Sequence, residues 1–133
     1  MKEIIKDGVV LARHIKPEDI KDGLNFFSAD EEFIQVGIWG NYENGKNLNA
    51  HIHNVVERTS NRTYETLYII NGGIEATIYT LDEAFVESFP VRQGEILILL
   101  ECGHGYKVIE DHTTVLEVKN GPYFGAEIDR RRI

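Results

Sequence analysis

A chain of 133 residues can bury one hydrophobic core but is too short for two ordinary domains, so we expect a single domain over residues 1–133. The formal net charge of −8 works against capture by DNA, RNA or an anionic membrane surface, and no apolar run is long enough to cross a bilayer. The charged N-terminus lacks a secretory signal and Cys102, the single cysteine, excludes an internal disulfide, so we expect a cytoplasmic protein.

The N-terminal third predicts two strands and little helix. Residues 9–12 form an apolar run typical of a strand, and residues 16–20, with a proline at the second position, predict a turn or one short helical turn. Residues 33–39 are rich in β-branched and aromatic side chains and predict a second strand, which turn residues such as Asn44-Gly45 close. The chain then enters the part that carries most of its motifs.

The remainder predicts a series of short strands with turns between them. These strands are expected at 50–55, 66–71, 74–80, 85–91, 95–100, 105–109 and 113–119. Apolar and polar side chains alternate in 74–79, which predicts one face towards a core, whereas 95–100 is apolar on both faces, as in a strand between two layers. The spacing predicts an all-β sandwich or barrel.

Histidines in the predicted strand 50–55 suggest a metal site. His51 and His53 are two residues apart, so in a strand both imidazoles lie on one face and can reach one ion. A His-x-His pair by itself is more often two unrelated side chains, so further ligands are required. Glu65 precedes the next strand and His104 lies in a predicted Gly-His-Gly turn, where chain reversals can bring both to the pair. Three imidazoles and one carboxylate suit a divalent transition metal and leave coordination positions free.

The spacing of these residues resembles the two motifs of the cupin superfamily. The first counterpart is Gly45, five residues, His51-Ile52-His53, then Glu65, six residues and Gly72. The second is Gly94, which opens the strand 95–100, with His104 following before Tyr106. The resemblance implies a single-domain cupin jelly-roll β-barrel, with the motif-bearing barrel over about residues 33–119, and a metal held by His51, His53, Glu65 and His104.

The chain departs from the cupin pattern at two places. Eleven residues separate His53 from Glu65, where the family has three or four, so Glu57 is an alternative carboxylate ligand. Glu65 is preferred because its spacing to Gly72 reproduces the second half of the motif. In the second motif the loop is one residue shorter, and Gly103 replaces the customary proline before the histidine, which leaves the position of His104 less defined.

The resemblance extends to the C-terminal part of the chain. Residues 116–125, Leu-Glu-Val-Lys-Asn-Gly-Pro-Tyr-Phe-Gly, are similar to the end of the cupin domain of type II mannose-6-phosphate isomerases. The similarity implies a carbohydrate-related function. We therefore expect an isomerase-like, metal-dependent enzyme that acts on a small, anionic or sugar-derived molecule, with Zn, Mn, Fe or Ni as the metal.

Several further side chains are candidates for the site. Glu65 and Tyr68 are candidate catalytic residues, since either could act as a general base. The candidate substrate-binding residues are Arg58, Arg62, Tyr106 and Lys119, although exposed arginines are usually solvated and strand tyrosines usually pack. His14 and His112 belong to neither motif and are interpreted as surface residues.

Two other functions remain open alongside the enzyme. A non-catalytic cupin could bind a small molecule or a metal, and a cupin that binds iron could be a dioxygenase. The expected partner in each case is a small molecule, with no nucleic acid and no membrane. Jelly rolls often cover or pair their edge strands, so a homodimer is a further expectation for which the sequence identifies no interface.

Overall fold

The computed structural model describes all residues of the chain, 1–133, and its regular structure is almost entirely β. A five-stranded antiparallel sheet contains, in spatial order, β1 (Lys2–Lys6), β2 (Val9–Ile15), β8 (Ile96–Leu99), β5 (Glu65–Asn71) and β10 (Thr114–Lys119). A three-stranded sheet contains β7 (Phe85–Arg92), β6 (Gly73–Tyr79) and β9 (Gly103–Val108). A separate hairpin is formed by β3 (Gly23–Phe26) and β4 (Gly37–Gly40). The prediction of an all-β fold is confirmed.

Helical structure is confined to two short elements. A 3-10 turn spans Pro17–Asp19 and begins with the proline, as the sequence predicts, and α1 spans Ala126–Asp129 near the C-terminus. Neither element has the length and apolar character that crossing a bilayer requires of a helix.

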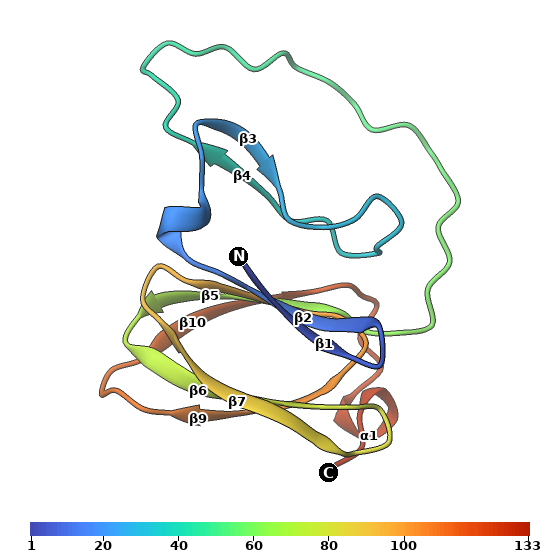
Figure 1. Cartoon of the computed structure of the whole chain (residues 1–133). Helices are drawn as coiled ribbons and strands as arrows, with labels where there is room; N and C mark the ends of the chain where they lie inside the picture. Colours follow the sequence, from blue (N-terminus) through green and yellow to red (C-terminus); the bar gives the residue numbers. More distant parts are fainter.

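The two larger sheets form two layers whose facing sides make the main hydrophobic core (Figure 1). In β6, Ile74, Ala76 and Ile78 are buried, which is the inward face that the alternating sequence predicts. The larger sheet contributes side chains that include Leu97, fully buried at the centre of β8. Side chains at every second position of the strands therefore fill the space between the layers.

A second, smaller core covers the outer face of the larger sheet. Ile15 of β2 and Ile98 of β8 pack there against Ile34 and Leu100. The β3–β4 hairpin and the loop between its strands lie over this face (Figure 1). Because β8 has a layer on each side, it is apolar on both faces, which confirms the interpretation of residues 95–100.

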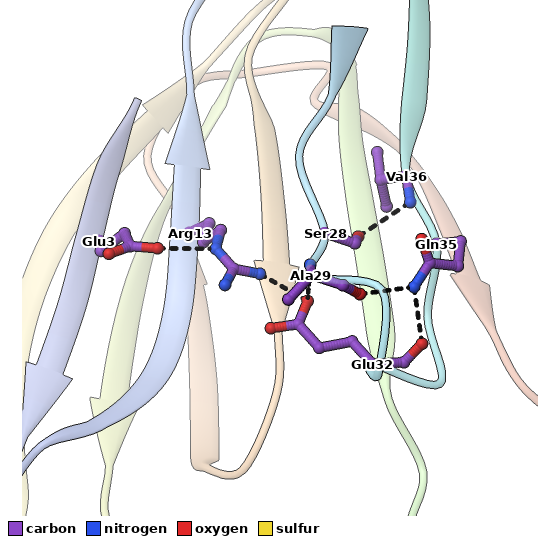
Figure 2. A network of polar contacts seen from close by, with 7 residues as sticks. All are labelled: Glu3, Arg13, Ser28, Ala29, Glu32, Gln35 and Val36. Carbon is purple, nitrogen blue, oxygen red and sulfur yellow. Dashed lines mark hydrogen bonds and ion pairs between the residues drawn. The ribbon is translucent and has the colours of Figure 1, made fainter.

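A buried arginine holds the loop of the hairpin to the sheet (Figure 2). Arg13 of β2 is 7% exposed, and it donates hydrogen bonds from Nε to Glu3, at 2.9 Å, and from Nη1 to Glu32, at 2.6 Å. Glu32 also accepts from the backbone N–H of Ala29, and Gln35 donates to two carbonyls of the same loop. Arg13 thus connects an edge strand of the sheet to the loop that covers the second core.

Most predicted strands match observed ones, and one prediction is wrong. Residues 50–55 form no strand: the whole stretch 41–64 lacks regular structure and arches away from the sheets (Figure 1). A strand requires a neighbour for its backbone hydrogen bonds, and residues 50–55 pair with no other strand. Of the predicted strand 33–39, only the last part belongs to β4. The short strands β1 and β3 were not predicted.

The turn between β5 and β6 depends on a glycine. Gly72 has φ +76°, and a Cβ atom at this position would lie 2.4 Å from Oγ1 and 2.9 Å from Cα of Thr113. Gly8, in the turn between β1 and β2, has φ +80°, but a Cβ there would meet no atom within 4 Å. The two glycines share a backbone conformation and differ only in the space around them.

Gly72→Ala should therefore be more destabilising than Gly8→Ala. We expect a loss of about 1 kcal/mol for Gly8→Ala from the left-handed backbone alone, and a further loss of about 1–2 kcal/mol for Gly72→Ala from the clash with Thr113. Urea denaturation of the two variants measures the difference. Equal losses would show that the clash is relieved by a small shift of the turn that contains Thr113.

Candidate functional site

A cluster of polar side chains surrounds Glu65 at one end of the space between the sheets. Glu65, the first residue of β5, is 8% exposed, and one of its oxygens accepts a hydrogen bond from Nζ of Lys119 at 3.1 Å. Its other oxygen lies 3.3 Å from Nε2 of His104 and accepts from the hydroxyl of Tyr106 at 3.4 Å. One carboxylate thus contacts three potential hydrogen-bond donors.

The registers of the strands explain why these four residues meet. Lys119 of β10 is the direct cross-strand partner of Glu65, so both side chains lie on the same face of the larger sheet. In the facing sheet, His104 and Tyr106 pair with Ile78 and Ala76, which belong to the core. Both residues of β9 therefore point inward, and their rings stack with centroids 5.3 Å apart. The cluster joins the two layers.

The charges of the cluster keep Glu65 ionised. Burial alone would raise the pKa of the Glu65 carboxyl, but the hydrogen bonds and charges of His104 and Lys119 outweigh it and hold the pKa at about 2. Hydrogen bonds to Glu117 and Glu65 raise the pKa of Lys119. Burial and the negative charge of Glu65 raise the pKa of Tyr106, so its hydroxyl remains a donor. At neutral pH the cluster is a carboxylate with an ammonium group and a phenol.

The single cysteine lies beside this cluster but is not activated. Burial raises the pKa of the Cys102 thiol to about 12, and the side chain packs against the main core. A thiol of such high pKa supplies almost no thiolate at neutral pH. Cys102 therefore acts as a small apolar residue.

Two features of His104 bear on metal binding. The 3.3 Å between its Nε2 and Oε2 of Glu65 equals, within a few tenths of an ångström, the separation of about 3 Å between two ligand atoms that share one ion. Its Nδ1 is buried and has no hydrogen-bond partner, so the partner that usually orients a metal-bound imidazole is missing. The distance between Nε2 and Oε2 therefore fits two ligands of one ion, whereas the surroundings of Nδ1 do not add to that fit. His104 lies within β9 and not in a turn, which corrects the prediction from the sequence.

The other two predicted ligands lie elsewhere. His51 and His53 are exposed in the segment 41–64, with their rings 5.0 Å apart and edge to face. They do not lie on one face of a strand, because no strand forms there. No three side chains of the His, Cys, Asp or Glu type lie close enough to hold a metal ion. Of the four predicted metal ligands, the structure thus brings Glu65 and His104 into contact and places His51 and His53 elsewhere.

The candidate substrate-binding and catalytic residues also lie in different parts of the molecule. Tyr106 and Lys119 are in the cluster, whereas Arg58, Arg62 and the alternative ligand Glu57 are exposed in the segment 41–64. Tyr68 is three residues after Glu65 in β5, so it lies on the opposite face of the strand and does not share the interior with the carboxylate.

Two residues near the cluster were missed from the sequence. Oε1 of Glu117 lies 2.7 Å from Nζ of Lys119, so the ammonium group forms ion pairs with both Glu117 and Glu65. Asn120 accepts a hydrogen bond from the backbone of Tyr64 and donates one to the carbonyl of Arg62, so it fixes the end of the segment 41–64 beside Glu65. The i, i+2 spacing of Glu117 and Lys119 in a predicted strand was a usable signal, whereas nothing in the sequence links Asn120 to Tyr64.

The cluster has the chemistry of a site for a polar small molecule. Its groups can accept hydrogen bonds through Glu65 and donate them through Lys119 and Tyr106, and their orientation is set by strands and not by loops. Comparisons of the chain with protein-family models, with curated proteins and with solved structures find no match.

Proposed function

We propose that the protein is a cupin that binds a divalent transition metal and acts as an isomerase-like enzyme on a small, anionic or sugar-derived molecule. The observation that carries the proposal is the contact between Glu65 and His104. These residues come from the two separate cupin-like motifs, about forty positions apart in the chain, and their donor atoms are 3.3 Å apart. Two ligands of one ion have to meet in this way.

The order of the strands supports a jelly roll. From β5 onwards the chain passes repeatedly between the two sheets, with β5, β8 and β10 in the larger sheet and β6, β7 and β9 in the smaller one. The motif glycines Gly72 and Gly94 lie in turns and have positive φ, which is the conformation that favours glycine. Both features are expected of the cupin arrangement that we propose.

In this proposal, His51 and His53 complete the metal site when the segment 41–64 closes over the Glu65 end of the sheets. One end of the segment is already held there by Asn120. Residues 46–62 contain three basic side chains and one acidic side chain, whereas the whole chain has a net charge of −8, so electrostatic attraction favours closure. The bound metal, Zn, Mn, Fe or Ni, would supply Lewis acidity towards a carbonyl or hydroxyl oxygen of the substrate.

The side chains of the cluster have distinct roles in binding. Lys119 and Tyr106 are the donors to a carboxylate or hydroxyl group of the substrate. Glu65 serves as a metal ligand and hydrogen-bond acceptor and is the candidate general base. Tyr68 has no part in the proposal, since it lies on the other face of β5.

The test is element-resolved metal analysis of protein purified without an affinity tag. We expect near-stoichiometric metal in the wild type and its loss in His51→Ala/His53→Ala and in His104→Ala. The matched control is His112→Asn, which removes an exposed histidine with φ 58° and supplies a residue that tolerates this conformation. Retention of metal in the site variants, or no metal in the wild type after reconstitution, would overturn the proposal.

The same preparation separates the alternative functions. Turnover of sugar phosphates or related anions by the metal-loaded protein supports the isomerase-like enzyme. Consumption of oxygen by the iron-loaded protein with a substrate would replace it by a dioxygenase. Metal binding with no turnover in either assay would replace it by a non-catalytic binding module.

A further inference from the structure

A second polar cluster, around His14 of β2, lies on the other side of β8 from Glu65. Nε2 of His14, in β2, lies 2.7 Å from Oε2 of Glu95, and the two side chains are only 6% and 14% exposed. The interpretation of His14 as a surface residue is wrong. Its ring stacks against Phe89 of β7, with centroids 5.3 Å apart, so the pair lies between the two sheets.

This cluster is separate from the Glu65 site. His14 pairs across the strands with Lys2 of β1, the edge strand, whereas Glu65 pairs with Lys119 of β10, the opposite edge. One strand, β8, lies between β2, which carries His14, and β5, which carries Glu65. The two clusters therefore lie on either side of β8, towards opposite edges of the larger sheet, and share no residue.

A pocket of about 350 Å³ lies over the His14–Glu95 pair. It is lined by Lys2, His14, Lys16, Phe89, Pro90, Arg92 and Glu95. The lining contains three permanently basic side chains and one carboxylate, although the chain as a whole has a net charge of −8. Phe89 and Pro90 add an apolar wall. Most of the charged side chains that line the pocket are thus basic.

The basic groups of the pocket are available to a ligand. Lys2 and Arg92 form ion pairs with Glu87 and Glu110, but these pairs are exposed and contribute little, so an anion can replace them at small cost. The ammonium group of Lys16 has no ion-pair partner. An anion in the pocket would therefore gain a contact with Lys16 and compete with two exposed carboxylates for Lys2 and Arg92.

The histidine is held in a fixed orientation. Oε2 of Glu95 also accepts a hydrogen bond from the backbone N–H of Arg92 at 2.9 Å, which fixes the carboxylate and, through it, the imidazole. Nδ1 of His14 has no hydrogen-bond partner in the chain. The Nδ1 edge of the ring is thereby held free of protein partners.

We propose that this pocket binds the phosphate group of a small phosphomonoester. Lys16, Arg92 and Lys2 neutralise the phosphate, and Phe89 and Pro90 contact the organic part. A phosphate group has more acceptor oxygens than a carboxylate group, so it suits a pocket with several cationic donors better. The pocket is also larger than a phosphate ion alone requires. The site does not depend on the metal centre.

The experiment is a titration of ¹⁵N-labelled, metal-free protein with inorganic phosphate and with phenyl phosphate, followed by NMR. We expect saturable shifts of the His14 imidazole and of the amides of Lys2 and Arg92, and a dissociation constant for phenyl phosphate at least threefold below that for inorganic phosphate. Lys16→Ala/Arg92→Ala should weaken binding at least tenfold. Neither substitution removes a partner of the His14–Glu95 contact, because Arg92 contributes only its backbone N–H.

Two controls make the titration specific. Lys107→Ala removes an exposed basic residue from β9 and should bind as the wild type does. His51→Ala/His53→Ala should also bind normally, which separates this site from the proposed metal centre. Unsaturable shifts, or unchanged binding in Lys16→Ala/Arg92→Ala, would overturn the phosphate site. Equal affinity for the two probes would overturn the contact of Phe89 and Pro90 with an organic group.

Discussion

Replacing Arg13 by methionine should lower the free energy of unfolding by about 3 kcal/mol. The guanidinium group is buried and is the shared partner of two carboxylates, one in β1 and one in the loop that covers the second core (Figure 2). Methionine fills a similar volume but leaves Glu3 and Glu32 without their cation. The expected loss comes from these unpaired charges, which also weaken the hold of the loop on the sheet.

Denaturation by urea of two further variants isolates the cause. Arg13→Met/Glu3→Gln/Glu32→Gln removes all three charges and should recover at least half of the lost stability. Arg131→Met breaks an exposed pair with Glu83 and should cost less than about 1 kcal/mol. If the triple variant is no more stable than Arg13→Met, the loss is due to packing of the arginine stem and not to its charge.

Glu65 should make the stability of the metal-free protein depend on pH in the acid range. Its pKa is lowered from 4.5 in the unfolded chain to about 2 in the folded protein, so the folded state favours the ionised carboxyl. The stabilisation is therefore complete above pH 4.5 and is lost as the pH falls towards 2. After solvent screening at the open end of the sheets, we expect a contribution of about 2 kcal/mol.

Glu65→Gln measures this contribution directly. At pH 7 the variant should be less stable than the wild type by the full amount, and the difference should shrink as the pH falls below 4.5. Glu57→Gln, which changes an exposed residue in the segment 41–64, should match the wild type throughout. A difference between Glu65→Gln and the wild type that is constant from pH 7 to pH 3 would contradict the lowered pKa.

Much of the fold could be predicted from local patterns. The alternation in β6 and the two apolar faces of β8 follow directly from the order of residues, because a strand exposes its side chains to two opposite faces. The short strands β1 and β3 could not be found in this way. Each is defined by pairing with a neighbour, and Lys2–Lys6 contains more charged than apolar side chains. The predicted strand 50–55 failed for the converse reason, since it has a suitable composition and no neighbour.

The residues of the candidate site could also be predicted only in part. The sequence singled out Glu65, His104, Tyr106 and Lys119, and the structure brings these four together. It could not show that His14 is buried, because the burial depends on Phe89 and Glu95, which are more than seventy positions away in the chain. The sequence also left open whether Glu65 belongs to the same strand as Tyr68. Only because β5 begins at Glu65 do the two side chains lie on opposite faces of the sheet.

The sequence by itself determined the all-β class, the turns and the residue types that carry chemistry, because these depend on neighbours along the chain. Only the tertiary structure decided which of those residues meet. The contact of His104 with Glu65 and the pocket at His14 arise from strand registers and from the facing of two sheets, and register is a property of paired strands and not of any one of them.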